Sequence, residues 1–429
     1  MIRRGEALRR SVRRRKGWQA AGVAARLSSA IRALRGCRLP YLARHFDAPP
    51  GARQAEALLA DLVAAPCPVG PVTAERPLAL YGAGNLGRLA RDYLKAVGCD
   101  FVFAIDRAAD RLQGDPQWAG VRLLTPEAVP DAVRRDVRLA VSVVTSPYVP
   151  LAASLAADGF EDVVPFYDVT ESFRHLHPLS NGWFAAPLTA DDRDSTVEVL
   201  ARWDDDVSRA HHLQFLAWRR LRQEWSFAGA PVANDNRFFI PQVLEVLRDD
   251  EVFVDGGAHH GEVSAAFANA VGTFRQIVAI EPDPQSRAQL LANFRARLDD
   301  AQAIICDFAL ADAEGEAPFH DGLDYASQLS ATGRMRVMRR RLDTLDFAPT
   351  LLKLHLEGAE LPALEGARDT LLTQRPLVLA TVYHNDDGIW RTPLWLMRTL
   401  PDYRFLFRAH SWCGTGAVVY AIPQERGAP

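Results

Sequence analysis

The sequence predicts an α/β fold with two domains, each built around a strand, a glycine turn and a helix. In one domain an apolar run over 252–254 ends in Asp255 and two glycines, and a helical pattern of apolar residues begins after Gly261. In the other, the apolar run 77–81 leads into GAGNLG (82–87) and a helix. A second apolar run then follows in each domain and ends in an acid, which completes a β–α–β unit. We therefore expect two Rossmann-like domains.

Length and composition indicate an ordinary globular protein. A chain of 429 residues suggests two to three domains, and 48% hydrophobic and 24% charged residues are typical of soluble proteins. The net charge of −3 gives no general affinity for nucleic acid. The five cysteines are widely spaced and form no C-x-x-C, so we expect neither a disulfide framework nor a zinc knuckle, and a cytoplasmic location. The longest uncharged stretch, 139–157, contains two prolines, so no transmembrane helix is expected.

Changes in pattern along the chain divide it into four segments. The first sixteen positions contain eight Arg and Lys residues and a single Glu, and an amphipathic helix is expected over 23–34. This arm could attach to an anionic membrane surface or an acidic glycan, although we favour a solvated arm with a helix packed on the next domain. The expected segments are the basic arm and helical N-terminal segment (1–72), a small Rossmann-like domain (73–170), a Trp-rich helical connector (171–242) and a larger α/β domain (243–429).

An acid inside the second glycine turn separates two kinds of cofactor. A carboxylate at Asp255 would repel the pyrophosphate of a dinucleotide. S-adenosylmethionine has no phosphate, so Asp255 can accept hydrogen bonds from its amino-acid end while Glu281 accepts from its ribose diol. Asp307, in a strand expected over 303–310, could accept from the adenine amino group, although a surface acid fits there as well. The alternative for the whole turn is an ordinary βα turn with a helix-capping acid.

The first glycine turn carries a dinucleotide fingerprint. Gly82, Gly84 and Gly87 form G-x-G-x-x-G after a strand and before a helix, and Asp106 ends the next strand. Only two further strands are expected, so the domain is half the usual size, and it resembles the small nucleotide-binding domains at the front of sugar-modifying enzymes. It is expected to bind NAD(H) or a nucleotide-sugar, or else to keep the fold for packing without a ligand.

Polar side chains gather where the later strands end. Strict alternation over 351–357 puts three of them on one face of the sheet, and strands ending near 385 and 412 should bring more to the same edge. A last strand at 417–422 makes seven strands in this domain. The scattered spacing of the polar side chains at this edge carries no metal-ligand signature, so no metal is predicted. The residues concerned are Lys353, His355, Glu357, His384, Asn385 and His410.

Five segments together resemble the FkbM family of S-adenosylmethionine-dependent methyltransferases over about 235–423: FVDGGAHHG, AIEPDP, RRRLDTL, LKLHLEGAE and TVYHNDDGIW. The resemblance implies a class I methyltransferase fold and methyl transfer to a hydroxyl, commonly of a sugar or a polyketide. His355 replaces the aspartate of the family's K-I-D-V-E-G-A-E, so no role of that aspartate carries over. The cofactor residues implied are Asp255, Gly257, Ala258, Gly261 and Glu281.

The leading hypothesis is O-methyl transfer to a sugar, glycan or polyketide-type acceptor. It requires a base for the departing proton, for which we favour His384, with His355, Glu357 and His410 as rivals. Lys353 either serves the site or ties down a neighbouring carboxylate such as Glu357. The alternatives are an NAD-dependent nucleotide-sugar oxidoreductase or epimerase using the first glycine turn, which lacks a Tyr-x-x-x-Lys pair, and a non-catalytic nucleotide-binding module.

Overall fold

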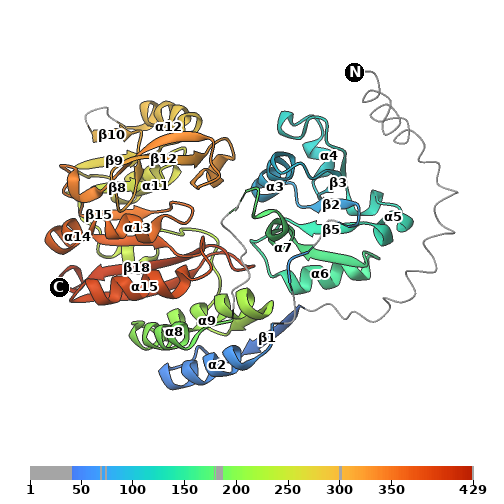
Figure 1. Cartoon of the computed structure of the whole chain (residues 1–429), viewed down its shortest axis with the longest axis horizontal. Helices are drawn as coiled ribbons and strands as arrows, with labels where there is room; N and C mark the ends of the chain where they lie inside the picture. The colour runs from blue at the N-terminus through green and yellow to red at the C-terminus, as the bar shows by residue number, and fades with distance from the viewer. Residues whose placement is uncertain are drawn as a thin grey trace, which may run out of the picture. The chain divides into compact units, whose positions relative to one another are not determined.

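The α/β class expected from the sequence is confirmed by the computed structural model, in which helices alternate with largely parallel sheets (Figure 1). The structure describes residues 41–67, 70–72, 75–177, 179, 187–298 and 302–427. The predicted basic arm and its helix lie outside these residues. In the part of the chain that is described, no helix is long and apolar enough to cross a membrane.

The small domain contains a five-stranded parallel sheet in the order β4-β3-β2-β5-β6. Short apolar runs such as LALY form its central strands because both faces of a parallel sheet are buried. The two-residue strand β4 is too short for a sequence pattern to indicate. The strands are β2 (Leu78–Tyr81), β3 (Phe101–Ile105), β4 (Leu123–Leu124), β5 (Arg138–Val141) and β6 (Asp162–Pro165), and the helices are α3 (Asn85–Ala96), α4 (Ala109–Leu112), α5 (Asp131–Asp136), α6 (Tyr148–Ala157) and α7 (Phe166–Thr170).

The larger domain contains a seven-stranded sheet in the order β10-β9-β8-β15-β16-β18-β17. The first five strands are parallel and β18 runs antiparallel to both of its neighbours. The chain order reverses between β8 and β15, and ligands of such sheets bind at the carboxyl ends of the strands at this point. The strands are β8 (Val252–Gly256), β9 (Gln276–Ile280), β10 (Ala303–Cys306), β15 (Leu351–Leu354), β16 (Leu377–Thr381), β17 (Tyr403–Ala409) and β18 (Ala417–Pro423), and the helices are α11 (Glu262–Val271), α12 (Pro284–Arg297), α13 (Glu360–Glu365), α14 (Arg368–Gln374) and α15 (Gly388–Thr399).

Two strands end earlier than the sequence suggests. The strand expected over 303–310 breaks after Cys306, and Ala309 and Leu310 form β11 of a separate sheet in the order β11-β14-β12-β13. The strand expected to reach Glu357 stops at Leu354. The other strands of the small sheet are β12 (Gly315–His320), β13 (Gln328–Leu329) and β14 (Met335–Arg340), and β12 pairs antiparallel with both β13 and β14.

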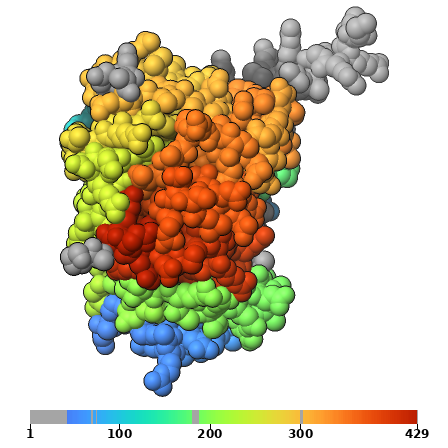
Figure 2. Space-filling view, turned by 90° about the vertical axis from the view of Figure 1, so that its left-hand side faces the viewer, coloured from blue at the N-terminus to red at the C-terminus, as the bar shows by residue number. Residues whose placement is uncertain are grey.

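The connector folds together with the segment that precedes the small domain. Strand β1 (Leu42–Phe46) pairs in parallel with β7 (Gln223–Phe227), and α2 (Ala52–Ala64) packs against α8 (Ala190–Arg202) and α9 (Asp206–Leu221). Figure 2 shows the blue surface of α2 beside the green surface of these helices. A short helix, α10 (Pro241–Leu244), then leads into β8.

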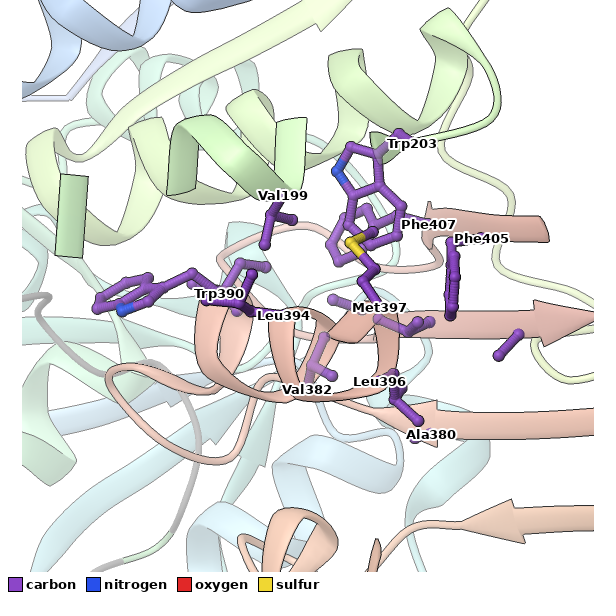
Figure 3. Packing of buried hydrophobic residues seen from close by; sticks show 14 of the residues in the cluster. Val199, Trp203, Ala380, Val382, Trp390, Leu394, Leu396, Met397, Phe405 and Phe407 are labelled. Atoms are coloured by element: carbon purple, nitrogen blue, oxygen red, sulfur yellow. The ribbon is translucent and has the colours of Figure 1, made fainter. Parts of the chain in front are cut away.

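Helix α15 joins the connector to the large sheet (Figure 3). Its Met397 lies in one buried cluster with Trp203, at the end of α8, and with Phe407 of β17. The rings of Trp203 and Phe407 are 5.5 Å apart, and the Trp203 indole donates to His212 Nδ1 at 3.0 Å. Replacing a buried aromatic residue of this kind by alanine costs about 3–5 kcal/mol, so this cluster holds the connector on the sheet.

Candidate functional site

A cavity of about 830 Å³ lies at the switch between β8 and β15. The residues that follow three neighbouring strands line it: Gly257 after β8, Glu281 after β9 and His355 after β15. Residues from the small domain and from the linker before α10 complete its wall. The parallel topology therefore brings together the strand-end residues singled out from the sequence.

The turn after β8 requires its glycines. Gly257 has φ +72°, and a Cβ there would lie 2.0 Å from the carbonyl oxygen of His355, so only glycine allows the turns after β8 and β15 to touch. Gly261 has φ +85°, and its Cβ would lie 2.7 Å from Leu290 Cδ1 of α12. Between them Ala258 lines the cavity. Both glycines thus serve the packing of this turn, and Gly257 and Ala258 bring it to the cavity wall.

Glu281 presents a buried carboxylate beside this turn. Its Oε2 accepts from the backbone N–H of His259 at 2.8 Å and its Oε1 from that of Asp283 at 2.9 Å. Burial raises the pKa of Glu281, and the two amide donors act in the opposite direction. Each oxygen keeps a further lone pair for a ligand hydroxyl, as the predicted ribose contact requires.

Asp255 is engaged by protein groups. Its Oδ1 accepts from Lys353 Nζ at 2.8 Å and its Oδ2 from Ser264 Oγ at 2.7 Å, and the residue is fully buried. It is absent from the described residues that line the cavity. Lys353 thus pairs with Asp255 instead of Glu357, and the contact of Asp255 with the amino-acid end of the cofactor stays a prediction.

Asp307 lies away from the cavity. Because β10 ends at Cys306, Asp307 falls in the exposed turn before β11, and the wall is formed by the next three residues, 308–310. The predicted adenine contact depended on one continuous strand through this acid. The break in the strand removes the basis for that prediction.

A histidine, a glutamate and a second histidine form a hydrogen-bonded cluster at the cavity. His355 Nε2 lies 3.2 Å from Glu357 Oε1, and His384 Nδ1 lies 3.0 Å from Glu357 Oε2. His355 and Glu357 line the cavity, whereas His384 is 1% exposed and is not among the described residues that line it. The hydroxyl of Tyr383 lies 3.1 Å from His355 Nε2. His355 thus borders the cavity and His384 lies buried beside it, whereas the sequence favoured His384 as the base.

In this cluster a neutral, weakly basic imidazole lies beside an ionised carboxylate. Burial lowers the pKa of His355 to about 3, so the imidazole is neutral at physiological pH. Burial alone would raise the pKa of Glu357, but the two adjacent imidazoles hold it at about 2. An ionised Glu357 can stabilise the positive charge that forms when His355 takes up a proton.

A strained turn sets the position of Glu357. Its φ is +51°, which is uncommon for a residue other than glycine, and Gly358 follows with φ +108°. The carboxylate of Glu360 accepts from the N–H groups of Leu356 and Gly358, both at 3.0 Å, and from Thr381 Oγ1 at 2.7 Å. Glu360 therefore holds the turn that places Glu357 between the two histidines.

The other strand-end candidates are occupied by packing contacts. His410 lines the cavity, but its Nδ1 lies 2.8 Å from the Ala233 carbonyl and its Nε2 lies 2.7 Å from the Tyr420 hydroxyl. Asn385 Nδ2 donates to the Gly358 carbonyl at 3.0 Å. These contacts give both residues a structural role, so His410 is a weaker candidate base than His355.

Among the described residues, two groups of ligand-type side chains could hold a metal ion, which the sequence spacing did not indicate. They are His355, Glu357 and His384, and a second group of His259, His260 and Asp324; in each group the ligand atoms lie within 4.8 Å of one another. His259 Nε2 already contacts Asp324 Oδ1 at 2.7 Å. Folding brings these residues together from separate strand ends and loops, so a linear motif cannot reveal them.

Three cavity residues escaped the sequence analysis. Arg237, in the linker before α10, brings a cation to the wall. Tyr383 precedes His384 and contacts His355. Tyr325 lies between β12 and β13 and lines the cavity. Adjacency to His384 was the available signal for Tyr383, and a lone arginine in a loop gives no signal.

The small-domain turn faces the same cavity. Gly82, Gly84 and Asp106 line it, whereas Gly87 serves packing, since a Cβ there would lie 2.1 Å from the Gly82 carbonyl oxygen. Three of the four residues predicted to bind a second nucleotide therefore share one space with the predicted methyl-donor site.

Comparison with known proteins supports a methyltransferase. Residues 255–407 match the sequence model of the methyltransferase FkbM domain, which confirms the resemblance for this part of the chain. The chain is similar in structure to a methyltransferase FkbM from Methylobacillus flagellatus KT, with a TM-score of 0.54 and 18% identity over 86% of this chain and 96% of that one. At this identity the likeness shows a shared fold.

A more distant likeness links the chain to the S-adenosylhomocysteine-bound methyltransferase PaMTH1 of Podospora anserina. Its TM-score is 0.29 and its identity 12%, over 65% of this chain and 97% of that one, and no inference is drawn from it. No curated protein sequence matches the chain. The family match alone implies S-adenosylmethionine as the methyl donor.

Proposed function

We propose that the protein transfers the methyl group of S-adenosylmethionine to a hydroxyl of a sugar or of a glycan- or polyketide-type acceptor. The observation that carries the proposal is that one cavity is lined both by the glycine turn with Glu281 and by His355 and Glu357. Methyl transfer to oxygen needs both parts, a donor site and a proton acceptor within reach of it.

The residues present fit the donor. Gly257 and Ala258 bring the turn after β8 to the cavity wall, and Glu281 beside it offers acceptors for a diol. When bound, S-adenosylmethionine supplies an electrophilic methyl group, so that as the acceptor oxygen attacks, the C–S bond breaks, an ether and a thioether form, and one proton is released. His355 is placed to take that proton while Glu357 stabilises the resulting imidazolium.

A weak base is sufficient for this step. The acceptor hydroxyl becomes strongly acidic only as its bond to the methyl carbon forms, so a neutral imidazole can receive the proton late. His384 acts through Glu357 and is a positioning residue in this scheme. The Lys353–Asp255 pair fixes the turn after β8 relative to β15 and so sets the donor site against His355.

The test is a methyl-transfer assay with isotope-labelled S-adenosylmethionine and panels of free sugars, nucleotide-sugars, glycans and polyketides. The proposal predicts label in an ether product of at least one panel member, with equimolar S-adenosylhomocysteine. Label incorporated only at nitrogen or carbon would contradict transfer to a hydroxyl. His45→Gln, an exposed site far along the chain from the cavity residues, serves as the control variant.

A further inference from the structure

The cavity is unusual in having two glycine turns on its wall, one from each Rossmann-like domain. The small domain contributes Gly82, Gly84 and Asp106, and the larger domain contributes Gly257 and Glu281. Single-ligand pockets span about 300–1,000 Å³, so a volume of about 830 Å³ lies near the upper end of that range. The cavity therefore joins the two turns in one continuous space.

Both turns use the same hydrogen bond between a strand-end acid and a turn amide. Asp106 Oδ2 accepts from the N–H of Ala83 at 2.7 Å, just as Glu281 Oε2 accepts from the N–H of His259 at 2.8 Å. Asp106 Oδ1 also accepts from Ala108 at 2.7 Å. Each Asp106 oxygen keeps a lone pair, so this acid can receive the hydroxyls of a ribose as Glu281 can.

The three glycines of the small-domain turn have separate tasks. Gly82 has φ +101°, which the turn itself requires, and Gly87 allows α3 to pack closely on the turn. Gly84 has φ −75°, which any residue can adopt, and a Cβ there would meet no atom within 4 Å. Neither backbone conformation nor packing explains this glycine, whereas a ligand lying against the turn does.

The surroundings of Gly84 suit a phosphate group. Gly84 is the N-cap of the 12-residue helix α3, and no side chain caps this end of the helix within the described residues. Uncapped N–H groups and the helix dipole favour an anion there. Arg237 adds a cation to the wall of the same cavity.

The small domain is held in register with the methyltransferase site. The N–H of Trp412 donates to the Val144 carbonyl at 2.7 Å, and Asn234 Nδ2 donates to the Thr145 carbonyl at 2.8 Å. Leu323 and Ala326, in the segment that covers the cavity, belong to the buried core of the small domain. A ligand on the small-domain turn would therefore be positioned relative to the methyl-donor site.

We propose that the small-domain turn binds the nucleoside diphosphate part of the methyl acceptor, so that the acceptor is a nucleotide-linked sugar. In this arrangement Asp106 receives the ribose hydroxyls and the start of α3 faces the phosphates. The glycosyl part extends through the shared cavity toward His355, and its hydroxyl is the one methylated. The inference rests on the proposed function and specifies its substrate class.

The test is calorimetric titration of the full-length protein with UDP, dTDP, GDP, CDP, ADP and NAD, each with and without saturating S-adenosylhomocysteine. We expect at least one nucleoside diphosphate to bind at one site per chain. Gly84→Val should weaken this binding about tenfold or more, because the new side chain fills ligand space, and should leave S-adenosylhomocysteine affinity within about twofold.

The matched control is Gly51→Val. Gly51 also has a conformation open to any residue and no atom within 4 Å of its Cβ, but it lies at the start of α2. Nucleotide affinity should be unchanged in this variant. The inference is overturned if no nucleoside diphosphate binds, if NAD alone binds, or if Gly84→Val binds as the wild type does. If the wild-type protein does not bind S-adenosylhomocysteine, the proposed function is overturned instead.

Discussion

Lys353 and Asp255 form a buried ion pair, with 2.8 Å between Nζ and Oδ1, across the two strands where the chain order of the large sheet reverses. The residues face each other in the register of β15 and β8. Lys353 Nζ also donates to the Gly257 carbonyl at 2.8 Å, which ties the pair to the glycine turn. Asp255 therefore positions the glycine turn at the cavity wall indirectly, by holding Lys353, which binds the Gly257 carbonyl.

Removing the cation should destabilise the protein strongly. Lys353→Met leaves a buried carboxylate without its partner, and breaking such a pair costs about 3–5 kcal/mol. The free energy of unfolding, measured by urea denaturation, should fall by that amount. Lys95→Met, at an exposed lysine of α3, should change it by no more than about 0.5 kcal/mol.

A double variant separates charge from packing. Lys353→Met combined with Asp255→Asn removes both charges, so it should recover part of the stability lost in the single variant. A single variant within about 1 kcal/mol of the wild type would show that the buried pair does not stabilise the turn.

The geometry of the histidine cluster predicts unequal effects on catalysis. His355→Gln should lower turnover at saturating substrate by about 10²–10⁴-fold, because His355 lines the cavity and takes the proton. His384→Gln should have a smaller effect, since His384 is buried against Glu357 and is not among the described residues that line the cavity. Affinity for S-adenosylhomocysteine should stay within about twofold in both variants.

Steady-state kinetics of methyl transfer on the acceptor found by the labelled assay would measure these effects. His45→Gln is the control and should retain wild-type turnover. A loss in His384→Gln equal to or greater than that in His355→Gln would reverse the assignment of the base to His355.

The α/β class and most strands could be predicted from the sequence because parallel strands are continuous apolar runs between turn residues. The turn at Gly257 and the acid Glu281 were found for the same reason, since local pattern places both at strand ends. Such patterns record which residues are buried in a strand. They do not record which side chain pairs with which across a sheet.

The structure departs from the expected site where tertiary contacts decide. Asp255 was expected to touch the cofactor, but the register of β8 with β15 places Lys353 opposite it. Asp307 was expected on the cavity wall, but the chain leaves the sheet after Cys306 to form β11. His384 was preferred as the base because it follows a strand expected to end beside Lys353, His355 and Glu357, and in the structure His355, rather than His384, is among the described residues that line the cavity.

Buried neutral histidines should make the protein sensitive to acid. Burial lowers the pKa of His212 from its ordinary value of 6.5 to about 3, so below pH 6.5 the unfolded chain takes up a proton that the folded chain does not. Unfolding is then favoured as the pH falls, by about 1.4 kcal/mol per pH unit for this one group until the folded-state pKa is reached.

Urea denaturation at a series of pH values between 7 and about 4 would measure this dependence. His212→Gln should reduce the slope of the free energy of unfolding against pH by about 1.4 kcal/mol per pH unit, which is the contribution of one proton. His45→Gln, at the surface, should leave the slope unchanged. Equal slopes in the wild type and in His212→Gln would contradict a neutral buried His212.

The most direct test of the account is calorimetric titration of the full-length protein with S-adenosylhomocysteine. We predict one site per chain, and a loss of about 1–3 kcal/mol in binding free energy for Glu281→Ala, because a buried charged acceptor is removed. Asp307→Ala should bind as the wild type does, since Asp307 is exposed outside the described cavity wall. Absence of binding to the wild type, or equal affinity in Glu281→Ala, would contradict a methyl-donor site at the turn after β8.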